Sequence, residues 1–140
     1  MNPFITTELF IKETAATELA NFRLQRDWQS KYRIIMQLGK QLPMLPAELK
    51  TAQTLVQGCE SAAWLQIQTA PLAFAFDSEA RVVKGIIALV LAVWYAHPQL
   101  PILDCWLQLN LGAELSTSRN NGVASVLKLM QHAVEAAASR

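Results

Sequence analysis

Eleven apolar residues follow one another from Ile86 to Ala96, in the sequence IIALVLAVWYA. A membrane-spanning helix needs about 18 or more such residues, so this run is too short to cross a bilayer. A helix with apolar side chains on every side must instead be surrounded by other elements. The run therefore predicts a helix at the centre of a small domain, with the rest of the chain packed around it.

The length and composition agree with one such domain. The chain has 140 residues, 52% of them hydrophobic and only 16% charged, with a net charge of +1. This length suits one domain over residues 1–140, and the apolar content supplies a sizeable core. A charge so close to zero gives no reason to expect nucleic acid or an anionic membrane as the main partner.

The beginning of the sequence and the cysteines indicate a compartment. The first residues, MNPFITTELFIKE, contain none of the three parts of a secretory signal, namely a basic stretch, an apolar stretch and a small-residue cleavage site. The two cysteines form no CxxC motif and no disulfide framework. We therefore expect a cytoplasmic protein in which both thiols are free.

The first half of the chain predicts two helices and then a change of period. A weakly patterned helix is expected over residues 6–21, and a stronger one begins after Asp27 as its cap and ends before Pro43. Residues 62–68 and 72–77 alternate apolar and polar side chains, which predicts a hairpin. Residues 54–57 are predicted as a third strand, with Gly58, Cys59 and Glu60 at the bend before the second.

Helices are predicted again in the second half. The apolar run is preceded by Ser78 as a candidate N-cap, with Arg81 and Lys84 expected on its solvent side. A short helix follows within residues 101–112, and a long amphipathic one begins near Ser116 or Ser118. Helices, a small antiparallel sheet and helices again indicate an α+β fold.

Most classes of reactive site find no support. Cys59, His97, Cys105 and His132 lack the close pairing of zinc ligands, so no metal site is expected. The sequence has neither a GxSxG motif nor a Gly-rich phosphate loop. Cys105 lies in the apolar stretch LDCWLQL, where a free cysteine packs as a small hydrophobic residue.

Cys59 is different because it follows a glycine, at a bend, among the polar residues Gln57, Glu60 and Ser61. Bends present side chains more often than they bury them. From the residues alone, a reactive thiol and a cysteine that merely occupies a turn both remain open.

The cluster SRNNG, Ser118 to Gly122, is also unusual. Arg119 lies at a helix start, where the helix dipole disfavours a cation, so its charge is either paired elsewhere or exposed at a frayed end. Gly122 in an early helical turn destabilises the helix, which indicates that another segment packs closely over it.

Four motifs taken together resemble the SufE/CsdE family of sulfur-acceptor proteins, more closely its CsdE branch. They are DWQSKYRIIMQLGKQLP, VQGCESAAWL, DSEARVVKGIIALVLA and LSTSRNNGV, and they occur in the family's order from about Phe22 to near the end. Ala62, Ala63 and Lys84 depart from the family pattern. The resemblance implies a single SufE-like domain with a SufE/NifU-like fold, in which helices flank a three-stranded antiparallel sheet.

The resemblance also implies a function. Cys59 matches the cysteine that takes sulfur from the persulfide of a cysteine desulfurase and passes it on, often to an iron–sulfur scaffold. Such a protein is not expected to be an enzyme by itself but a sulfur-transfer partner and activator of the desulfurase. It needs no cofactor, since the pyridoxal phosphate belongs to the desulfurase.

The resemblance extends to further residues. Arg119 matches an arginine that accompanies the cysteine, as a cation that favours a persulfide anion. The implied partner surface includes Gly58, Glu60, Ser61, Asp77, Ser78 and Arg81. Two other classes remain open: a cysteine-dependent enzyme that acts on a small molecule without a partner, and an adaptor whose Cys59 is inert.

Overall fold

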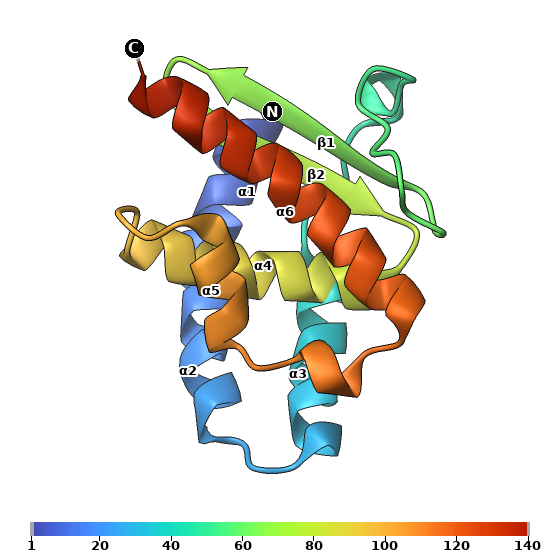
Figure 1. Ribbon diagram of the computed structural model, residues 1–140, viewed down its shortest axis with the longest axis vertical. Helices are drawn as coiled ribbons and strands as arrows, with labels where there is room; N and C mark the ends of the chain where they lie inside the picture. Colours follow the sequence, from blue (N-terminus) through green and yellow to red (C-terminus); the bar gives the residue numbers. More distant parts are fainter. Residues whose placement is uncertain (1, 140) are drawn as a thin grey trace.

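A computed structural model describes residues 2–139, and it shows an α+β fold in which helices flank a small antiparallel sheet (Figure 1). The N-terminal helices are α1 (Pro3–Phe10), which continues through a π-helical segment (Ile11–Ala15) into α2 (Ala16–Leu24), and α3 (Trp28–Gln41), which Asp27 caps as predicted. A 3₁₀ turn (Ala47–Leu49) and strands β1 (Ala63–Thr69) and β2 (Leu72–Ser78) follow. The chain then forms α4 (Arg81–Ala96), α5 (Ile102–Gln108), a 3₁₀ turn (Gly112–Glu114) and α6 (Thr117–Ala138).

The hairpin forms where the alternation of side chains predicts it. β1 pairs with β2 in an antiparallel register that sets Leu65 opposite Phe76 and Ile67 opposite Phe74. Leu65, Phe74 and Phe76 are buried in the core. Among the described residues the sheet has two strands, so the prediction of three strands is wrong.

The segment predicted as the third strand is a turn with a single bridge. The amide of Leu55 donates to the carbonyl of Thr51, and the Thr54 hydroxyl donates to the carbonyl of Leu49 at 2.6 Å. These local bonds fold residues 51–54 back on themselves, so only Leu55 makes an isolated bridge, to Trp64. Two backbone hydrogen bonds frame this bridge, from the Val56 amide to the Ala63 carbonyl and from the Leu65 amide to the Thr54 carbonyl, and Gly58, with φ of +91°, lies in the turn that leads back to β1.

Helix α4 is the central element, as the apolar run predicts. It crosses the middle of the molecule, with α2 and α3 on one side and the hairpin and α6 on the other (Figure 1). Every residue from Val82 to Trp94 is buried. Its partners therefore cover the helix on all sides, which is the arrangement that such a continuous apolar run requires.

Helices α3 and α4 touch backbone to backbone at two glycines. A Cβ built on Gly85 would lie 1.9 Å from the carbonyl oxygen of Ile35, and one built on Gly39 would lie 2.2 Å from that of Arg81. No other residue type fits at either position without a shift of the opposite backbone. The two glycines thus fix how α4 lies against α3.

The start of α4 differs from the prediction. The helix begins at Arg81, with Ala80 at the N-cap position and no side-chain cap. Ser78 belongs to the end of β2, where its hydroxyl accepts from the Ala80 amide and donates to the Ala62 carbonyl, both at 3.0 Å. As the last strand residue, Ser78 lies two positions before the N-cap and is too early to cap the helix.

Lys84 was expected in solvent beside Arg81, but only Arg81 is exposed. Lys84 is buried, and its Nζ lies 3.0 Å from Oδ1 of Asp77, whose side chain is only 3% exposed. Lys50 Nζ lies 3.1 Å from Oδ2 of the same carboxylate, which also accepts from the backbone amide of Leu45 at 3.0 Å. The carboxylate thus joins the segment after α3, the end of β2 and the first turn of α4.

The pKa of Asp77 reflects two opposing effects. Burial raises it, but the hydrogen bonds from Lys84, from the Leu45 amide and from Lys50 outweigh burial and hold the pKa of this carboxyl below its ordinary value. Asp77 therefore stays ionised in the folded protein, and its charge compensates that of buried Lys84.

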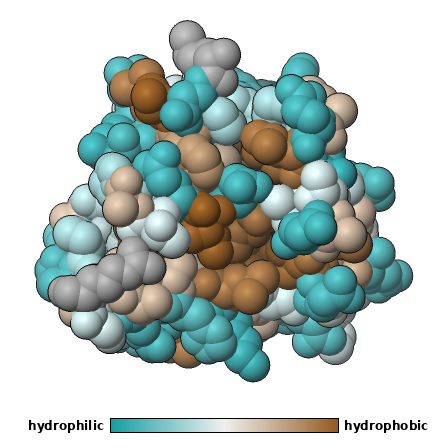
Figure 2. Space-filling model, turned by 90° about the horizontal axis from the view of Figure 1, so that it is seen from above, coloured by the Kyte–Doolittle hydropathy of each residue, from teal (hydrophilic) through white to brown (hydrophobic). Residues whose placement is uncertain are grey.

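The molecular surface is mixed in character. Figure 2 shows one face of the molecule with hydrophilic side chains around an apolar hollow. Among the described residues, no helix combines the length and the apolar character that a membrane crossing needs.

Replacement of Asp77 by asparagine tests whether this carboxylate holds the fold together. Asp77→Asn leaves Lys84 buried without a counter-charge, and we expect it to lower the free energy of unfolding at pH 7 by about 3–5 kcal/mol. The matched control, Glu79→Gln, changes an exposed carboxylate and should stay within about 0.5 kcal/mol. Denaturant unfolding of the three proteins measures both differences.

The difference in unfolding free energy between the wild type and Asp77→Asn should depend on pH. A lowered pKa in the folded state stabilises the protein above the unfolded value of about 3.9, and this stabilisation is lost as the pH falls through the lowered value. The difference between wild type and Asp77→Asn should therefore shrink below about pH 4. A constant difference from pH 7 down to acid unfolding would contradict the role given to the Asp77 charge.

Candidate functional site

Cys59 lies at the bend that leads into β1, and its neighbour Gly58 makes this bend possible. Gly58 has φ of +91°, a conformation that side chains disfavour, and a Cβ at this position would lie 2.7 Å from the hydroxyl of Ser125 in α6. Both the backbone angle and the close approach to α6 therefore require glycine. They bring the bend against the N-terminal half of α6.

The Cys59 side chain points inward from this bend. It is half-buried, and its Sγ lies 3.6 Å from the carbonyl oxygen of Gly122, to which the thiol donates. A Cβ at Gly122 would lie 3.9 Å from this sulfur. The bend that carries Cys59 does pack over Gly122, but 3.9 Å is an ordinary van der Waals distance, so this contact does not require glycine.

The environment of Cys59 favours the neutral thiol. Burial raises the pKa of the Cys59 thiol above its ordinary value. Because the thiolate is the nucleophilic form, the thiol is poorly reactive near neutral pH in this conformation.

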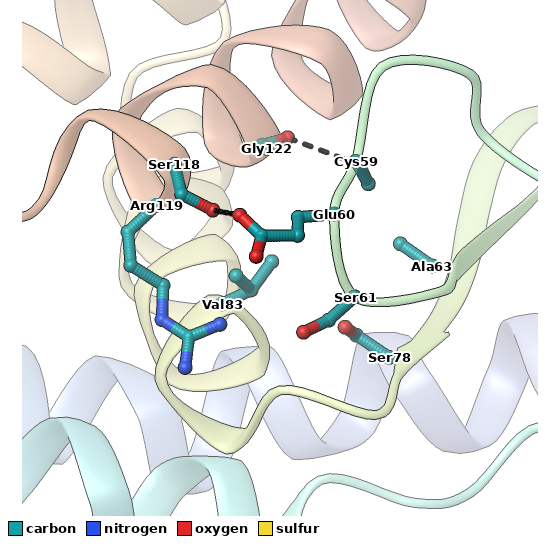
Figure 3. A pocket seen from close by; sticks show the side chains of 9 residues that line it. All are labelled: Cys59, Glu60, Ser61, Ala63, Ser78, Val83, Ser118, Arg119 and Gly122. Atoms are coloured by element: carbon teal, nitrogen blue, oxygen red, sulfur yellow. Dashed lines mark hydrogen bonds between the residues drawn. The ribbon is translucent and has the colours of Figure 1, made fainter.

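Cys59 and Arg119 line the same small pocket (Figure 3). Cys59 enters it from the bend and Arg119 from the first turns of α6, with the Glu60 carboxylate between them in this view. The Ser118 hydroxyl donates a short hydrogen bond to Glu60. The remaining lining residues are Ser61, Ala63, Ser78, Val83 and Gly122.

The pocket is narrow. Its cavity volume of about 10 Å³ gives room for about one water-sized sphere beside the sulfur. No described carboxylate lies within ion-pair distance of the Arg119 guanidinium, so its charge is free to act on a group in the pocket. The arrangement combines a thiol, a carboxylate and a cation that forms no ion pair with any described residue, with little space between them.

The structure separates the residues predicted for a partner surface into two groups. Gly58, Glu60 and Arg81 are exposed, and Ser61 is half-buried at the pocket. Asp77 and Ser78 are only 2% and 8% exposed, because their side chains bond to the backbone and to the two lysines. Direct contact of these two residues with a partner is therefore not expected. Instead, the Ser78 hydroxyl binds the Ala62 carbonyl at the base of the bend, and the Asp77 carboxylate accepts from the Ser78 amide.

Two contacts of the site were missed by the sequence analysis. Ser118 binds Glu60, and the Gly122 carbonyl binds the Cys59 thiol. Both lie in the cluster SRNNG, which stood out in the sequence, but only Arg119 was given a chemical role there, and Gly122 only a packing role. A carbonyl group has no signal in the sequence, and the Ser118–Glu60 pair joins positions 58 residues apart.

Cys105 is fully buried in the core, as predicted. Among residues 2–139, no three His, Cys, Asp or Glu side chains gather as a metal ion would require.

Alkylation tests how firmly the bend holds Cys59. At pH 7, iodoacetamide should modify Cys59 more slowly than a free thiol, and the rate should rise over a higher pH range than for a free thiol, because burial raises the pKa of Cys59. Ser118→Ala removes the contact with Glu60, and the loss of about 1 kcal/mol from the closed state should speed modification about fivefold. Mass spectrometry after timed quenching gives the rates.

The control is Thr117→Ala, at a neighbouring exposed hydroxyl for which no side-chain hydrogen bond is seen. Its rate should equal that of the wild type. Equal rates for the wild type and Ser118→Ala would show that the Glu60–Ser118 contact does not hold the bend closed.

Comparison with known proteins places the chain. Residues 16–134 match the family model of SufE, the Fe-S metabolism associated domain. The sulfur acceptor protein CsdE of Escherichia coli is 38% identical over 133 residues, which cover 87% of this chain and 85% of CsdE. An uncharacterised SufE-like protein of Rhizobium etli is 34% identical over 113 residues, with 73% of this chain and 76% of the relative covered. The chain belongs to the SufE/CsdE family.

Proposed function

We propose that this protein accepts sulfur on Cys59 from the persulfide of a cysteine desulfurase and passes it to another protein. The observation that carries the proposal is the position of Cys59, at an exposed bend but with its sulfur turned into a narrow pocket that also contains Arg119. The similarity to CsdE, a protein named as a sulfur acceptor, supports the same function.

The transfer is a displacement at sulfur. The Cys59 thiolate attacks the outer sulfur of the donor persulfide, a new S–S bond forms, and the S–S bond of the donor breaks. The donor cysteine leaves as a thiolate, and Cys59 becomes the persulfide. No net oxidation occurs, because one persulfide replaces another, and the rate depends on thiolate fraction and on access, as in thiol–disulfide exchange.

The closed pocket suits the persulfide of Cys59, which is the product of this reaction, better than it suits the attacking thiolate. With the bend closed, the pKa of the thiol is raised and the sulfur is half-buried, so attack requires the bend to move outward. The contacts at its tip are few, namely Cys59 with Gly122 and Glu60 with Ser118. A partner that binds the open bend shifts this equilibrium, and reclosure shields the added sulfur from other thiols.

Arg119 supplies the charge that the resting thiol lacks. We assign it the role of stabilising the anionic sulfur that forms when Cys59 or its persulfide loses a proton. Its guanidinium has five N–H donors and remains charged at all relevant pH values.

The proposed function also implies a source of the cofactor, a downstream acceptor and a compartment. The chain needs no cofactor for this step, since the desulfurase supplies the pyridoxal phosphate that mobilises sulfur from cysteine. An iron–sulfur scaffold is the class of acceptor we expect downstream, in keeping with the description of the matched family. A reducing cytoplasm keeps both thiols free for this work.

Replacement of each cysteine by serine tests the proposal. Incubated with a cysteine desulfurase and free cysteine, the wild type should gain one sulfur on Cys59, seen as added mass. Cys59→Ser should fold normally and gain none. Cys105→Ser should still gain sulfur but unfold more easily, by about 1–3 kcal/mol, because a hydroxyl replaces a fully buried thiol.

These variants also separate the two rival classes. Uptake of sulfur by Cys59→Ser would refute the proposal, and conversion of a small thiol substrate by the wild type without any desulfurase would favour an enzyme. Retention of the biological function by Cys59→Ser would favour an adaptor with an inert cysteine.

Arg119 is tested through the rate of transfer. Arg119→Ala should slow single-turnover transfer about tenfold at pH 7, because the loss of a nearby cation disfavours the anionic sulfur. The rate profile should shift to higher pH, and Arg119→Lys should restore most of the rate. Binding to the desulfurase, measured separately, should not change. Weaker binding with a normal transfer rate would place Arg119 in the partner surface instead.

A further inference from the structure

An open, charged pocket lies beside the Cys59 bend. It is formed between α3, the segment that follows it, the paired ends of β1 and β2, and the start of α4, and its cavity volume is about 340 Å³. Its charged lining residues are Lys40, Lys50, Arg81, Lys84, Asp77 and Glu79. Four cations face two carboxylates there, so the pocket is positively charged.

The cations differ in how far they are already neutralised. Lys84 and Lys50 share the carboxylate of Asp77, and Lys50 also lies 4.9 Å from the centre of the Trp64 ring. Lys40 and Arg81 are exposed, and neither forms an ion pair with any described residue. The one other carboxylate, that of Glu79, is exposed and has no ion-pair partner among residues 2–139. Positive charge thus exceeds what the protein itself compensates.

The pocket shares a wall with the Cys59 site. Ser78 lines both cavities, and the Ala62 carbonyl at the base of the bend accepts from the Ser78 hydroxyl and from the Glu79 amide. A protein large enough to present a persulfide to Cys59 will therefore also cover this pocket.

We propose that this pocket receives a carboxylate side chain of the desulfurase that docks over the Cys59 bend. The proposal rests on the sulfur-acceptor function given above and adds the chemistry of the contact. A carboxylate complements the uncompensated charge of Lys40 and Arg81, and the exposed Met44 and the ring of Trp64 offer apolar contact to the methylenes of an Asp or Glu side chain.

The location decides between a protein carboxylate and a free anion. The pocket is wide and open, and two of its four cations are held by Asp77, so it lacks the close convergent donors that retain a small anion. A carboxylate that arrives on a docking protein needs no such cage, because the rest of the interface positions it. Charge pairs of this kind speed association and set orientation, and they weaken with salt.

Charge reversal tests the contact. The double variant Lys40→Glu/Arg81→Glu changes only the two unpaired cations and leaves Asp77 with its lysines. We expect its dissociation constant for the desulfurase to rise about tenfold or more at low ionic strength, with a smaller effect at high salt. The control is Arg26→Glu, at an exposed arginine between α2 and α3, which reverses one charge where the double variant reverses two and should change the constant less than twofold.

Cross-linking identifies the partner group. A zero-length carbodiimide reagent, which joins an amine to a carboxylate in contact with it, should link Lys40 to an Asp or Glu of the desulfurase, located by mass spectrometry. Lys40→Arg keeps the charge but removes the reactive amine, so it should retain affinity and lose this cross-link.

The outcomes separate this inference from the proposed function. If the wild type binds the desulfurase and gains sulfur, while the double variant binds equally well at low salt, the carboxylate pocket is overturned and the sulfur-acceptor function stands. If the wild type neither binds nor gains sulfur, the proposed function itself fails. Weakened binding of the double variant, together with normal transfer at saturating desulfurase, supports the pocket as a docking contact.

Discussion

The contact between α3 and α4 at Gly39 and Gly85 is the constraint on which the other parts of this structure depend. The carbonyl oxygens of Ile35 and Arg81 occupy the space in which side chains would otherwise lie. Two helices that meet at their backbones have little freedom to slide or rotate, because close-packed interiors resist displacement. The first turn of α4 is therefore fixed relative to α3, and every group attached to that turn is fixed with it.

The buried carboxylate of Asp77 and the neighbouring Ser78 connect the α3–α4 contact to the bend. It binds Lys84 in α4, Lys50 and the Leu45 amide after α3, while Ser78 beside it holds the carbonyl of Ala62. A buried charge is stabilising only when its partners are in place, so the network specifies one arrangement of these segments. Lys50 and Lys84 are paired with Asp77 in this network, whereas Lys40 and Arg81 have no ion-pair partner among the described residues.

The site itself balances protection against reactivity. In the proposed function, the burial that shields a persulfide on Cys59 also raises the pKa of the thiol that forms it, so one conformation cannot serve both needs well. The bend meets this conflict by being firmly attached at its base and weakly at its tip, where Glu60 and Cys59 each make a single contact with α6. Such a segment opens at low free-energy cost without disturbing the core.

The sequence alone was enough to predict the central helix, the hairpin, the cap of α3 at Asp27 and the family, because each depends on local periodicity or on residues adjacent in the chain. It left Ser116 and Ser118 as alternative caps of α6, of which the structure shows Ser116. It predicted a third strand wrongly, since local hydrogen bonds of residues 51–54 compete with pairing and leave no trace in the alternation. Only the tertiary structure decided that Lys84 is buried against Asp77, that Cys59 points at the Gly122 carbonyl, and that Arg119 shares its pocket. These contacts join distant parts of the chain, and their partners are chosen by how the helices pack rather than by sequence spacing.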